Sequence, residues 1–375
     1  MAEPFKNLIN SALVEACGLH LCRRWPAFDR PAFERQALDG LAGLEMKARA
    51  MQVADALEAT LPADFDRAAG IIESALAPAA NDDRLGFQTS ADGLAGWIGW
   101  PLGEFIARRG LADPERALLA LHALTQRFTA EFAIRPFLVQ RLEPTLTALG
   151  RWQYDPSPHV RRLVSEGSRP RLPWGLRIQR LVRDPSPTLP LLLTLQDDAS
   201  EYVRRSVANH LNDIAKDHPA VVVEWLQAHL PDATPERRAL LRHASRTLVK
   251  QGDARVLKAW GLGNTLRGSV DFLLTPASVR IGGKLQLVLD LASTSAQPQA
   301  LAIDYVVHHV KANGSTSPKV FKGWKCVLGA HIGCRLQKSH SLKPVTTRVL
   351  YPGVHRIDIQ VNGKCVASAA FTLHS

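Results

Sequence analysis

Apolar residues recur at intervals of three and four along the first two thirds of the chain, which is the spacing of one face of an α-helix. Segments that keep this pattern include FKNLINSALVEA, FDRAAGIIESAL, GWIGWPLGEFIARRG and PERALLALHALTQRFTAEF. In LADPER, Asp113 is placed as a helix cap and Pro114 at the first helical position. The pattern therefore predicts helices from the N-terminus to about residue 260.

From about residue 155 the helical pattern begins to repeat. The repeated segments are DPSPHVRRLVSEG, DDASEYVRRSVANHLNDIAKDHPAVVVEWL and DATPERRALLRHASRTLVKQGDARVLKAW. In each, an acidic or proline turn leads into a helix that opens with paired arginines. Degenerate helical pairs at intervals of roughly 35 to 43 residues are typical of HEAT-like solenoids, which expose a curved binding surface. A non-repetitive α-helical bundle is the alternative.

The hydrophobic period changes from helical to alternating after AWGLGNTLRG. SVRIGGKLQLVLDLAST, ALAIDYVVHHVKANG and TTRVLYPGVHRIDIQVNGKCVASAAFTL are rich in β-branched residues and turn at Gly, Asn and Pro. The VNGK sequence predicts a tight hairpin. Short strands over roughly 110 residues favour an immunoglobulin-like sandwich. We therefore predict a mainly α chain with two domains, a HEAT-like solenoid at 1–261 and an all-β domain at 262–375.

Positive charge is concentrated in the second predicted domain. The whole chain has a net charge of +11, and residues 262–375 hold 13 Lys and Arg against 4 Asp, which is +9. No acidic residue lies between Asp304 and Asp358. A one-sided basic surface of this kind favours a polyanionic partner, although a soluble basic domain without a partner has the same composition.

Composition and motifs exclude several classes of protein. No apolar run reaches the length of a membrane span, and the N-terminal MAEPFKNLIN lacks a signal-like apolar region, so we expect a cytosolic protein, at the nucleoid if bacterial. The five cysteines have no CxxC spacing, which favours free thiols over disulfides or a zinc site. Walker, GxGxxG, HExxH and GxSxG motifs are missing. An enzyme with this sequence is expected to need no metal and no nucleotide cofactor.

The segment RFTAEFAIRPF raises the first question of chemistry. Its phenylalanines suit a buried helix that ends near Pro136, yet Glu131 lies among them with Arg127 and Arg135 four residues to either side. That spacing suits a structural ion-pair ladder on one helix, or a site. Spacing alone favours the ladder.

Two more acids lie close to arginines in the repeats. Glu166 follows Arg162 by four residues in VRRLVSEGSRPRLPW, and Asp213 lies in RRSVANHLNDIAKD. Trp174 follows a basic turn, where a core position and an exposed position are both compatible with the sequence. For any one of these acids alone, an ion pair or a helix-end hydrogen bond is the simpler interpretation.

Taken together, TQRFTAEFAIRPFL, VRRLVSEGSRPRLPW and RRSVANHLNDIAKDHP resemble AlkC-type DNA glycosylases of the HEAT-like alkylation repair family. GWKCVLGAHIGCRLQKSHSLKPVTTRVLYPGVHRIDIQVNG resembles the immunoglobulin-like domain carried by one branch of that family. The resemblance implies a monomer that binds duplex DNA and excises alkylated bases such as 3-methyladenine and 3-methylcytosine, without a deep base-flipping pocket. It implies an active site formed by Glu131, Glu166, Trp174 and Asp213.

The residue types suit that chemistry. An N3-alkylated base is already cationic and leaves readily, so carboxylates near the sugar can stabilise the cationic transition state without protonating the base. An indole face favours a cation. We expect arginines and lysines to contact DNA phosphates; the predicted contacts are Arg127, Arg161, Arg162, Arg169, Arg171, Lys322, Lys325, Arg335, Lys338, His340 and Lys343. A non-enzymatic solenoid that binds damaged DNA is the alternative, because helical repeats commonly serve as scaffolds.

Overall fold

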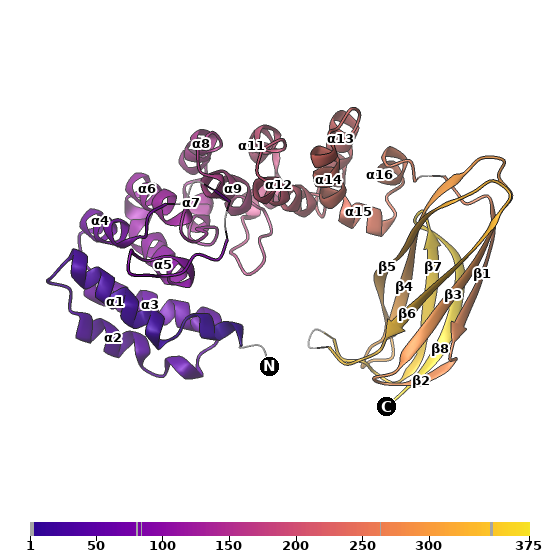
Figure 1. The fold of residues 1–375 in the computed structure, drawn as a ribbon, viewed down its shortest axis with the longest axis horizontal. Helices are drawn as coiled ribbons and strands as arrows, with labels where there is room; N and C mark the ends of the chain where they lie inside the picture. Colours follow the sequence, from indigo (N-terminus) through magenta and orange to yellow (C-terminus); the bar gives the residue numbers. More distant parts are fainter. Residues whose placement is uncertain (1–3, 80–81, 84, 263, 346–347) are drawn as a thin grey trace. The chain divides into compact units, whose positions relative to one another are not determined.

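The computed structural model describes residues 4–79, 82–83, 85–262, 264–345 and 348–375. Helices fill the chain up to Ala259, and strands follow from Gly268 (Figure 1). The predicted order of a helical region followed by an all-β region is therefore confirmed. Within the described residues, no helix is both long enough and apolar enough to cross a membrane.

The helices are α1 (Ser11–Arg24), α2 (Arg30–Leu38), α3 (Met46–Thr60), α4 (Phe65–Ala75), α5 (Gly99–Arg109), α6 (Pro114–Thr125), α7 (Arg135–Gln140), α8 (Leu142–Trp152), α9 (Pro158–Gly167), α10 (Gln179–Arg183), α11 (Leu189–Leu195), α12 (Glu201–Ile214), α13 (Pro219–His229), α14 (Pro235–Ala244), α15 (Arg246–Gln251) and α16 (Ala254–Ala259). The strands are β1 (Gly268–Thr275), β2 (Ser278–Arg280), β3 (Lys284–Ser293), β4 (Gln299–Val310), β5 (Thr316–Leu328), β6 (Gly333–Ser341), β7 (Gly353–Val361) and β8 (Lys364–His374).

The chain forms two compact units. One comprises residues 1–218 and 233–244, and the other comprises residues 219–232 and 245–375. The change from helix to strand falls where the sequence places it, near residue 262, but α13, α15 and α16 group with the strands. The predicted domain boundary between residues 261 and 262 therefore remains a prediction.

Many helices of the first unit pack against helices that are not their neighbours in sequence. Helix α9 lies against α12 and α12 lies against α14, while α8 and α11 cover α9 (Figure 1). Local signals begin several of these helices: Asp113 accepts a hydrogen bond from the Arg116 backbone N–H at the start of α6, with Pro114 directly after it. Helices α9 and α12 carry two of the four predicted active-site residues, Glu166 and Asp213.

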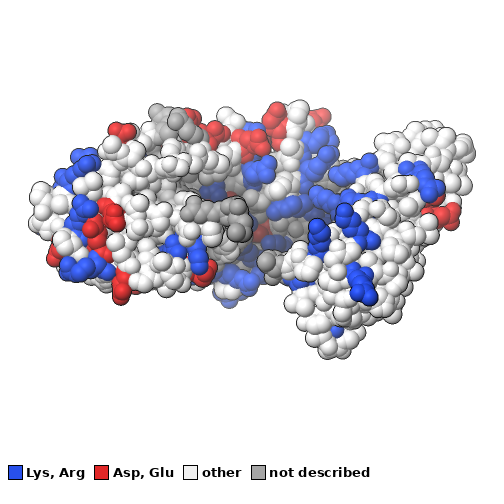
Figure 2. Space-filling view, turned by 60° about the horizontal axis from the view of Figure 1, so that its bottom comes forward, with Lys and Arg blue, Asp and Glu red and all other residues white. Residues whose placement is uncertain are grey.

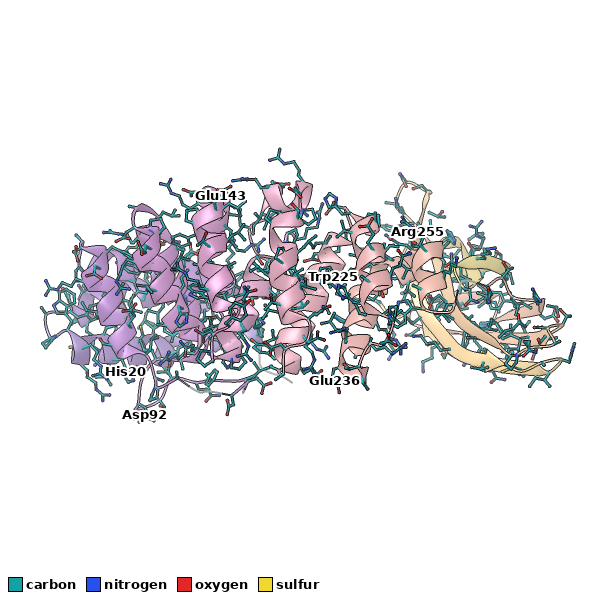
Figure 3. The ribbon with its side chains drawn as sticks, turned by 90° about the horizontal axis from the view of Figure 1, so that it is seen from above. His20, Asp92, Glu143, Trp225, Glu236 and Arg255 are labelled. Atoms are coloured by element: carbon teal, nitrogen blue, oxygen red, sulfur yellow. The ribbon has the colours of Figure 1, made fainter. Side chains whose placement is uncertain are left out.

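The long connection between α4 and α5 is fastened along its length. The His20 ring bonds the Ser90 carbonyl at 2.8 Å, and Figure 3 shows His20 close to Asp92, two residues after Ser90. Further along, the Ser200 hydroxyl donates to Asp83 at 2.9 Å, and the ring of Phe87 packs against that of His159. This segment therefore spans from α1 to α9 and α12.

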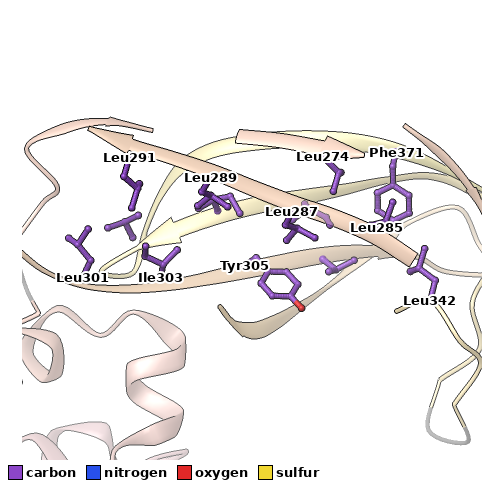
Figure 4. Packing of buried hydrophobic residues seen from close by; sticks show 14 of the residues in the cluster. Leu274, Leu285, Leu287, Leu289, Leu291, Leu301, Ile303, Tyr305, Leu342 and Phe371 are labelled. Carbon is purple, nitrogen blue, oxygen red and sulfur yellow. The ribbon is translucent and has the colours of Figure 1, made fainter. Parts of the chain in front are cut away.

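The second unit holds a two-sheet sandwich. One sheet has the order β1-β3-β6 and the other β2-β8-β7-β4-β5, with antiparallel pairing except between β2 and β8. Inward-facing leucines, isoleucines and valines of both sheets form its core (Figure 4). Asn362 and Gly363 both have positive φ, 49° and 78°, so the predicted VNGK hairpin is confirmed.

One end of the sandwich core is lined by histidines. His309, His340 and His355 continue the inward rows of β4, β6 and β7 and are at most 6% exposed. Neither ring nitrogen of His309 has a hydrogen-bond partner among the described residues. Burial lowers the pKa of His309 to about 3, with Arg348, His355, His340 and Lys319 acting in the same direction; burial also lowers the pKa of His340 to about 4.

Acid is therefore expected to destabilise this unit. The unfolded chain takes up protons near pH 6.5 whereas the folded imidazoles resist them, so stability is complete above pH 6.5 and falls as pH decreases towards 3 to 4. Lowering the pH from 7 to 5 should cost about 2 kcal/mol for each of His309 and His340. Thermal melts of the full chain across this range measure the loss.

The His309→Leu variant should lose less stability over the same pH range, because it removes one of the two buried imidazoles whose pKa is lowered. His374→Leu, which changes an exposed histidine of the same sandwich, should melt with wild-type pH dependence. An unchanged pH dependence in His309→Leu would show that this imidazole does not titrate with unfolding.

Candidate active site

The helix predicted across Arg127 to Phe137 is wrong. Helix α6 ends at Thr125 and α7 begins at Arg135, so Glu131 lies in the connection between them. The Thr129 hydroxyl accepts a hydrogen bond from the Glu131 backbone N–H at 3.3 Å, which favours a turn over a helix. Pro136 adds to the break because it lacks a backbone donor.

Without that helix the ion-pair ladder cannot form. Arg127 donates to two backbone carbonyls instead, those of Ala77 at 2.6 Å and Ala123 at 2.8 Å. Arg135 likewise donates to backbone carbonyls. Glu131 forms an ion pair with neither Arg127 nor Arg135, so it can pair with a residue on another helix.

That partner is Arg162 on α9. Its Nη1 lies 2.7 Å from Glu131 Oε2, and its Nη2 lies 3.7 Å from Glu166 Oε1. Arg169 continues the series, with Nη1 2.5 Å from Glu166 Oε1 and Nε 2.8 Å from Asp213 Oδ2. The three acids and two arginines thus form one continuous chain of alternating charge, which we call the carboxylate cluster.

The cluster draws its members from separate parts of the fold. Glu131 comes from the connection before α7, Glu166 from the last turn of α9 and Asp213 from the last turn of α12. Their side chains are 13%, 6% and 1% exposed, respectively. The acids that the sequence singled out therefore converge, and Glu131 is the most accessible of the three.

Burial and the neighbouring arginines act oppositely on Glu166. Burial by itself raises the pKa of this carboxyl, but the Arg162 and Arg169 guanidiniums, with a 2.7 Å hydrogen bond from the Ser206 hydroxyl, hold the pKa below its ordinary value. Glu166 is therefore ionised at neutral pH.

Four residues that the sequence analysis missed complete the cluster. Thr129 donates to Glu131 at 2.9 Å, Ser206 binds Glu166, and Lys216 donates to Asp213 Oδ1 at 2.8 Å. The Tyr202 ring lies 4.8 Å from the Arg162 guanidinium carbon. Only Lys216, three residues after Asp213 in the turn that follows α12, could have been found from spacing.

Trp174 is exposed on the segment between α9 and α10. Its side chain is 74% exposed, which excludes the core position left open by the sequence. Its φ is +63°, a left-handed backbone conformation that is strained for a bulky residue. The indole meets the Phe5 ring edge to face, with centroids 6.4 Å apart. A strained, exposed tryptophan is a common feature of binding sites.

Several predicted phosphate contacts have partners inside the protein. Arg161 forms a two-point ion pair with Asp198 at 2.7 and 3.0 Å, and Arg171 forms one with Asp217 at 2.6 and 2.7 Å. Arg169 is only 6% exposed and bonded to two carboxylates, so a direct phosphate contact does not fit its position. Arg162 is similarly committed to the cluster. Both arginines fix the acids in place.

The basic residues of the sandwich lie on two edge strands. Lys322 and Lys325 lie on β5, and Arg335 and Lys338 lie on β6; we call these four residues the basic edge. The two strands are neighbours, because Lys338 Nζ donates to the Lys322 carbonyl at 2.8 Å. Figure 2 shows Lys and Arg on the visible face of the sandwich with few acidic side chains beside them.

Two predicted contacts near this edge differ in the structure. His340 is 6% exposed and its Nδ1 bonds the Tyr305 hydroxyl at 3.1 Å, so it faces the core and does not fit a phosphate contact. Lys343, two residues after the end of β6, is exposed. Lysines on edge strands also prevent strand-to-strand aggregation.

Other candidate sites are less informative. A groove of about 500 Å³ lies between α12 and α14, lined by residues of both charges, among them Arg204, Arg205 and Glu236. The described parts of the chain contain no group of three or more His, Cys, Asp or Glu that could hold a metal ion.

Comparison with known proteins identifies the family. A model described as the C-terminal Ig-like domain of the uncharacterised protein YhaZ matches residues 269–375. The uncharacterised protein YhaZ of Bacillus subtilis (strain 168) is 34% identical over 372 residues, covering 98% of each protein. The Pseudomonas fluorescens alkylpurine DNA glycosylase AlkC, in a structure bound to DNA containing an abasic site analog, is 35% identical, with a TM-score of 0.90 and 100% of both chains covered. The chain therefore belongs to the family that includes AlkC and YhaZ, with a HEAT-like solenoid followed by an immunoglobulin-like domain.

Proposed function

We propose that this protein is a monofunctional DNA glycosylase that removes cationic N-alkylated bases, 3-methyladenine and 3-methylcytosine, from duplex DNA. The observation that carries the proposal is the convergence of Glu131, Glu166 and Asp213 in one cluster. The similarity of the full chain to an alkylpurine DNA glycosylase supports a role for that cluster in base excision.

The cluster suits hydrolysis of an N-glycosidic bond with a cationic leaving base. Departure of the base places positive charge on the deoxyribose, and ionised carboxylates stabilise that charge. Both contacts of Glu131 fall on Oε2, so Oε1 accepts no hydrogen bond from a described residue and can accept one from water. The products are a free alkylated base and an abasic site.

Trp174 supplies the aromatic part of the proposed site. Its exposed indole can face the cationic base or sugar without a change in the core. Presentation of a side chain at the surface suits recognition of the lesion without a deep base-flipping pocket. No cofactor enters the proposed reaction.

DNA binding is proposed for both units. On the sandwich, the basic edge and Lys343 provide charge for backbone phosphates. On the helical unit, Arg171 remains a candidate, since an arginine paired with one aspartate still has donors to offer; Arg161 has fewer to offer, because it also donates to the Asp155 and Pro156 carbonyls. The partner is duplex DNA with an alkylated base, bound by a monomer.

The test is release of a free methylated base from methylated duplex DNA, followed by chromatography of the small-molecule fraction. Release of 3-methyladenine or 3-methylcytosine supports the proposal. Tight binding of the same DNA without release would instead support the alternative, a solenoid that recognises damage without cutting it.

Trp174→Ala is expected to slow base release by about tenfold or more, because the site loses the aromatic face that we assign to the cation. Its free energy of unfolding should stay within about 0.5 kcal/mol of the wild-type value, since the side chain is exposed. Single-turnover excision and a thermal melt measure the two effects.

Tyr154→Ala is the matched control, because Tyr154 is equally exposed, at 73%, on the same unit. It should excise at the wild-type rate. Normal excision by Trp174→Ala would remove Trp174 from the proposed site.

A further inference from the structure

Arg135 is a fully buried charge next to the carboxylate cluster. It is the first residue of α7 and is 0% exposed. By volume it is the largest fully buried side chain among the described residues. A buried guanidinium is costly unless its donors are used. Nη1 donates to the Gly167 carbonyl at 2.7 Å, Nε donates to the Leu176 carbonyl, and Nη2 has no partner among the described residues.

The two carbonyls lie at either end of the segment that carries Trp174. Gly167 is the last residue of α9, where backbone carbonyls lack helical partners and attract a cation. Leu176 lies two residues beyond Trp174. One guanidinium therefore ties both ends of residues 168–175 to the start of α7.

Packing shows how closely this segment rests on Arg135. A Cβ added at Gly175 would lie 3.1 Å from Arg135 Cδ and 3.2 Å from its Nε. The segment can lie against the arginine because position 175 has no side chain. Trp174, one residue earlier, is exposed and strained, so its own packing does not hold its backbone in place.

The same side chain lies in the field of all three acids. Burial lowers the pKa of Arg135 to about 10, and Arg169 adds to the effect, while Asp213, Glu131 and Glu166 oppose it. Arg135 is therefore charged at neutral pH. It makes no ion pair with the acids among the described residues, so its donors remain committed to the two carbonyls.

We propose that Arg135 is a positioning residue that fixes Trp174 relative to the carboxylate cluster by clamping the Gly167 and Leu176 carbonyls. The role in catalysis rests on the proposed glycosylase function, whereas the clamp itself does not. Arg135 touches neither DNA nor base. It acts through the backbone of the segment that presents the indole.

The experiment uses full-length protein labelled with 5-fluorotryptophan and follows the Trp174 fluorine resonance, assigned with Trp174→Phe. Arg135→Lys keeps the charge but lacks the planar fork that reaches both carbonyls. We expect its Trp174 resonance to shift or broaden, and its single-turnover excision to fall at least tenfold with DNA affinity within twofold of wild type.

Arg116→Lys is the matched control. Arg116 is also an arginine of the helical unit with a mostly buried side chain, 17% exposed, and it pairs with Asp66 and Glu73 on α4. This variant should leave both the Trp174 resonance and excision at wild-type values, although its melting temperature falls.

Gly175→Val is the second variant, in case Arg135→Lys does not fold, because it should displace the segment while leaving Arg135 in place. An unchanged Trp174 resonance in a folded Arg135→Lys or Gly175→Val protein would overturn the clamp. An altered resonance with wild-type excision would overturn the positioning role. If wild-type protein releases no base, the proposed function fails, but the resonance still tests the clamp.

Discussion

Replacing Asp213 with asparagine is expected to slow base release in a single turnover by about 100-fold or more. Asp213 is the least exposed acid of the cluster, so water screens its charge least and the cationic transition state depends on it strongly. Asparagine has one acceptor oxygen, so it can keep the hydrogen bond from Arg169 or the one from Lys216 but not both, and we expect the variant to fold with a lower melting temperature. Single-turnover excision at saturating enzyme, beside a thermal melt, measures the effect.

Glu73→Gln controls for this change. Glu73 on α4 also forms a two-point ion pair with an arginine, Arg116, but it lies outside the carboxylate cluster. It should excise normally. Equal losses in Asp213→Asn and Glu73→Gln would mean that loss of an ion pair, rather than of a charge at the site, slows the reaction.

Glu131→Gln and Glu166→Gln should change excision in the same direction as Asp213→Asn. The Glu166 variant is also expected to melt at a lower temperature, because its buried arginine partners lose a counter-charge. Glu131 is more exposed than Glu166, so Glu131→Gln should slow excision with a smaller fall in melting temperature. Wild-type rates in all three variants would remove the cluster from the proposed mechanism.

Neutralising Lys322, Lys325, Arg335 and Lys343 together, each to glutamine, should weaken DNA binding by about 100-fold at moderate salt. Each lost phosphate contact lowers the slope of log affinity against log salt by about 0.9, so the slope should flatten by roughly 3 to 4. Substitution is preferable to deleting the sandwich, since α13, α15 and α16 belong to the same compact unit. Binding measured across a salt series gives both numbers.

A second quadruple variant removes the same charge from other exposed positions of the sandwich: Arg280, Lys284, Lys311 and Lys364. It should bind DNA more tightly than the first variant and keep a steeper salt slope. If the two variants behave alike, the lysines of the basic edge act only through net charge, and protection of the edge strands explains their position.

The helical region and its change to strands could be predicted because each rests on local periodicity. The sandwich was predicted less completely: β5 and β6 lie in the basic segment, where Pro318, Gly323 and several lysines hide the alternation. These residues are tolerated because both strands are at sheet edges, where unpaired backbone faces solvent. Edge position is a property of the fold that spacing does not reveal.

The candidate site was likewise predicted only in part. Glu131 has arginines four residues to either side, yet its partner is Arg162 on another helix, because a threonine turn and Pro136 break the helix that would have made the ladder. The contacts of Arg135 with Gly167 and Leu176 span 32 and 41 residues, so no local pattern could have indicated them. The resemblance to AlkC-type glycosylases identified the three acids. Only the tertiary structure showed which arginines pair with them.

The most direct test of the central claim is single-turnover release of 3-methyladenine from a duplex with one lesion, by wild-type protein and by Asp213→Asn. The account predicts a free base and an abasic site with wild type, and at least about 100-fold slower release by the variant at unchanged DNA binding. Tight binding by both proteins with the base still in the DNA would contradict it.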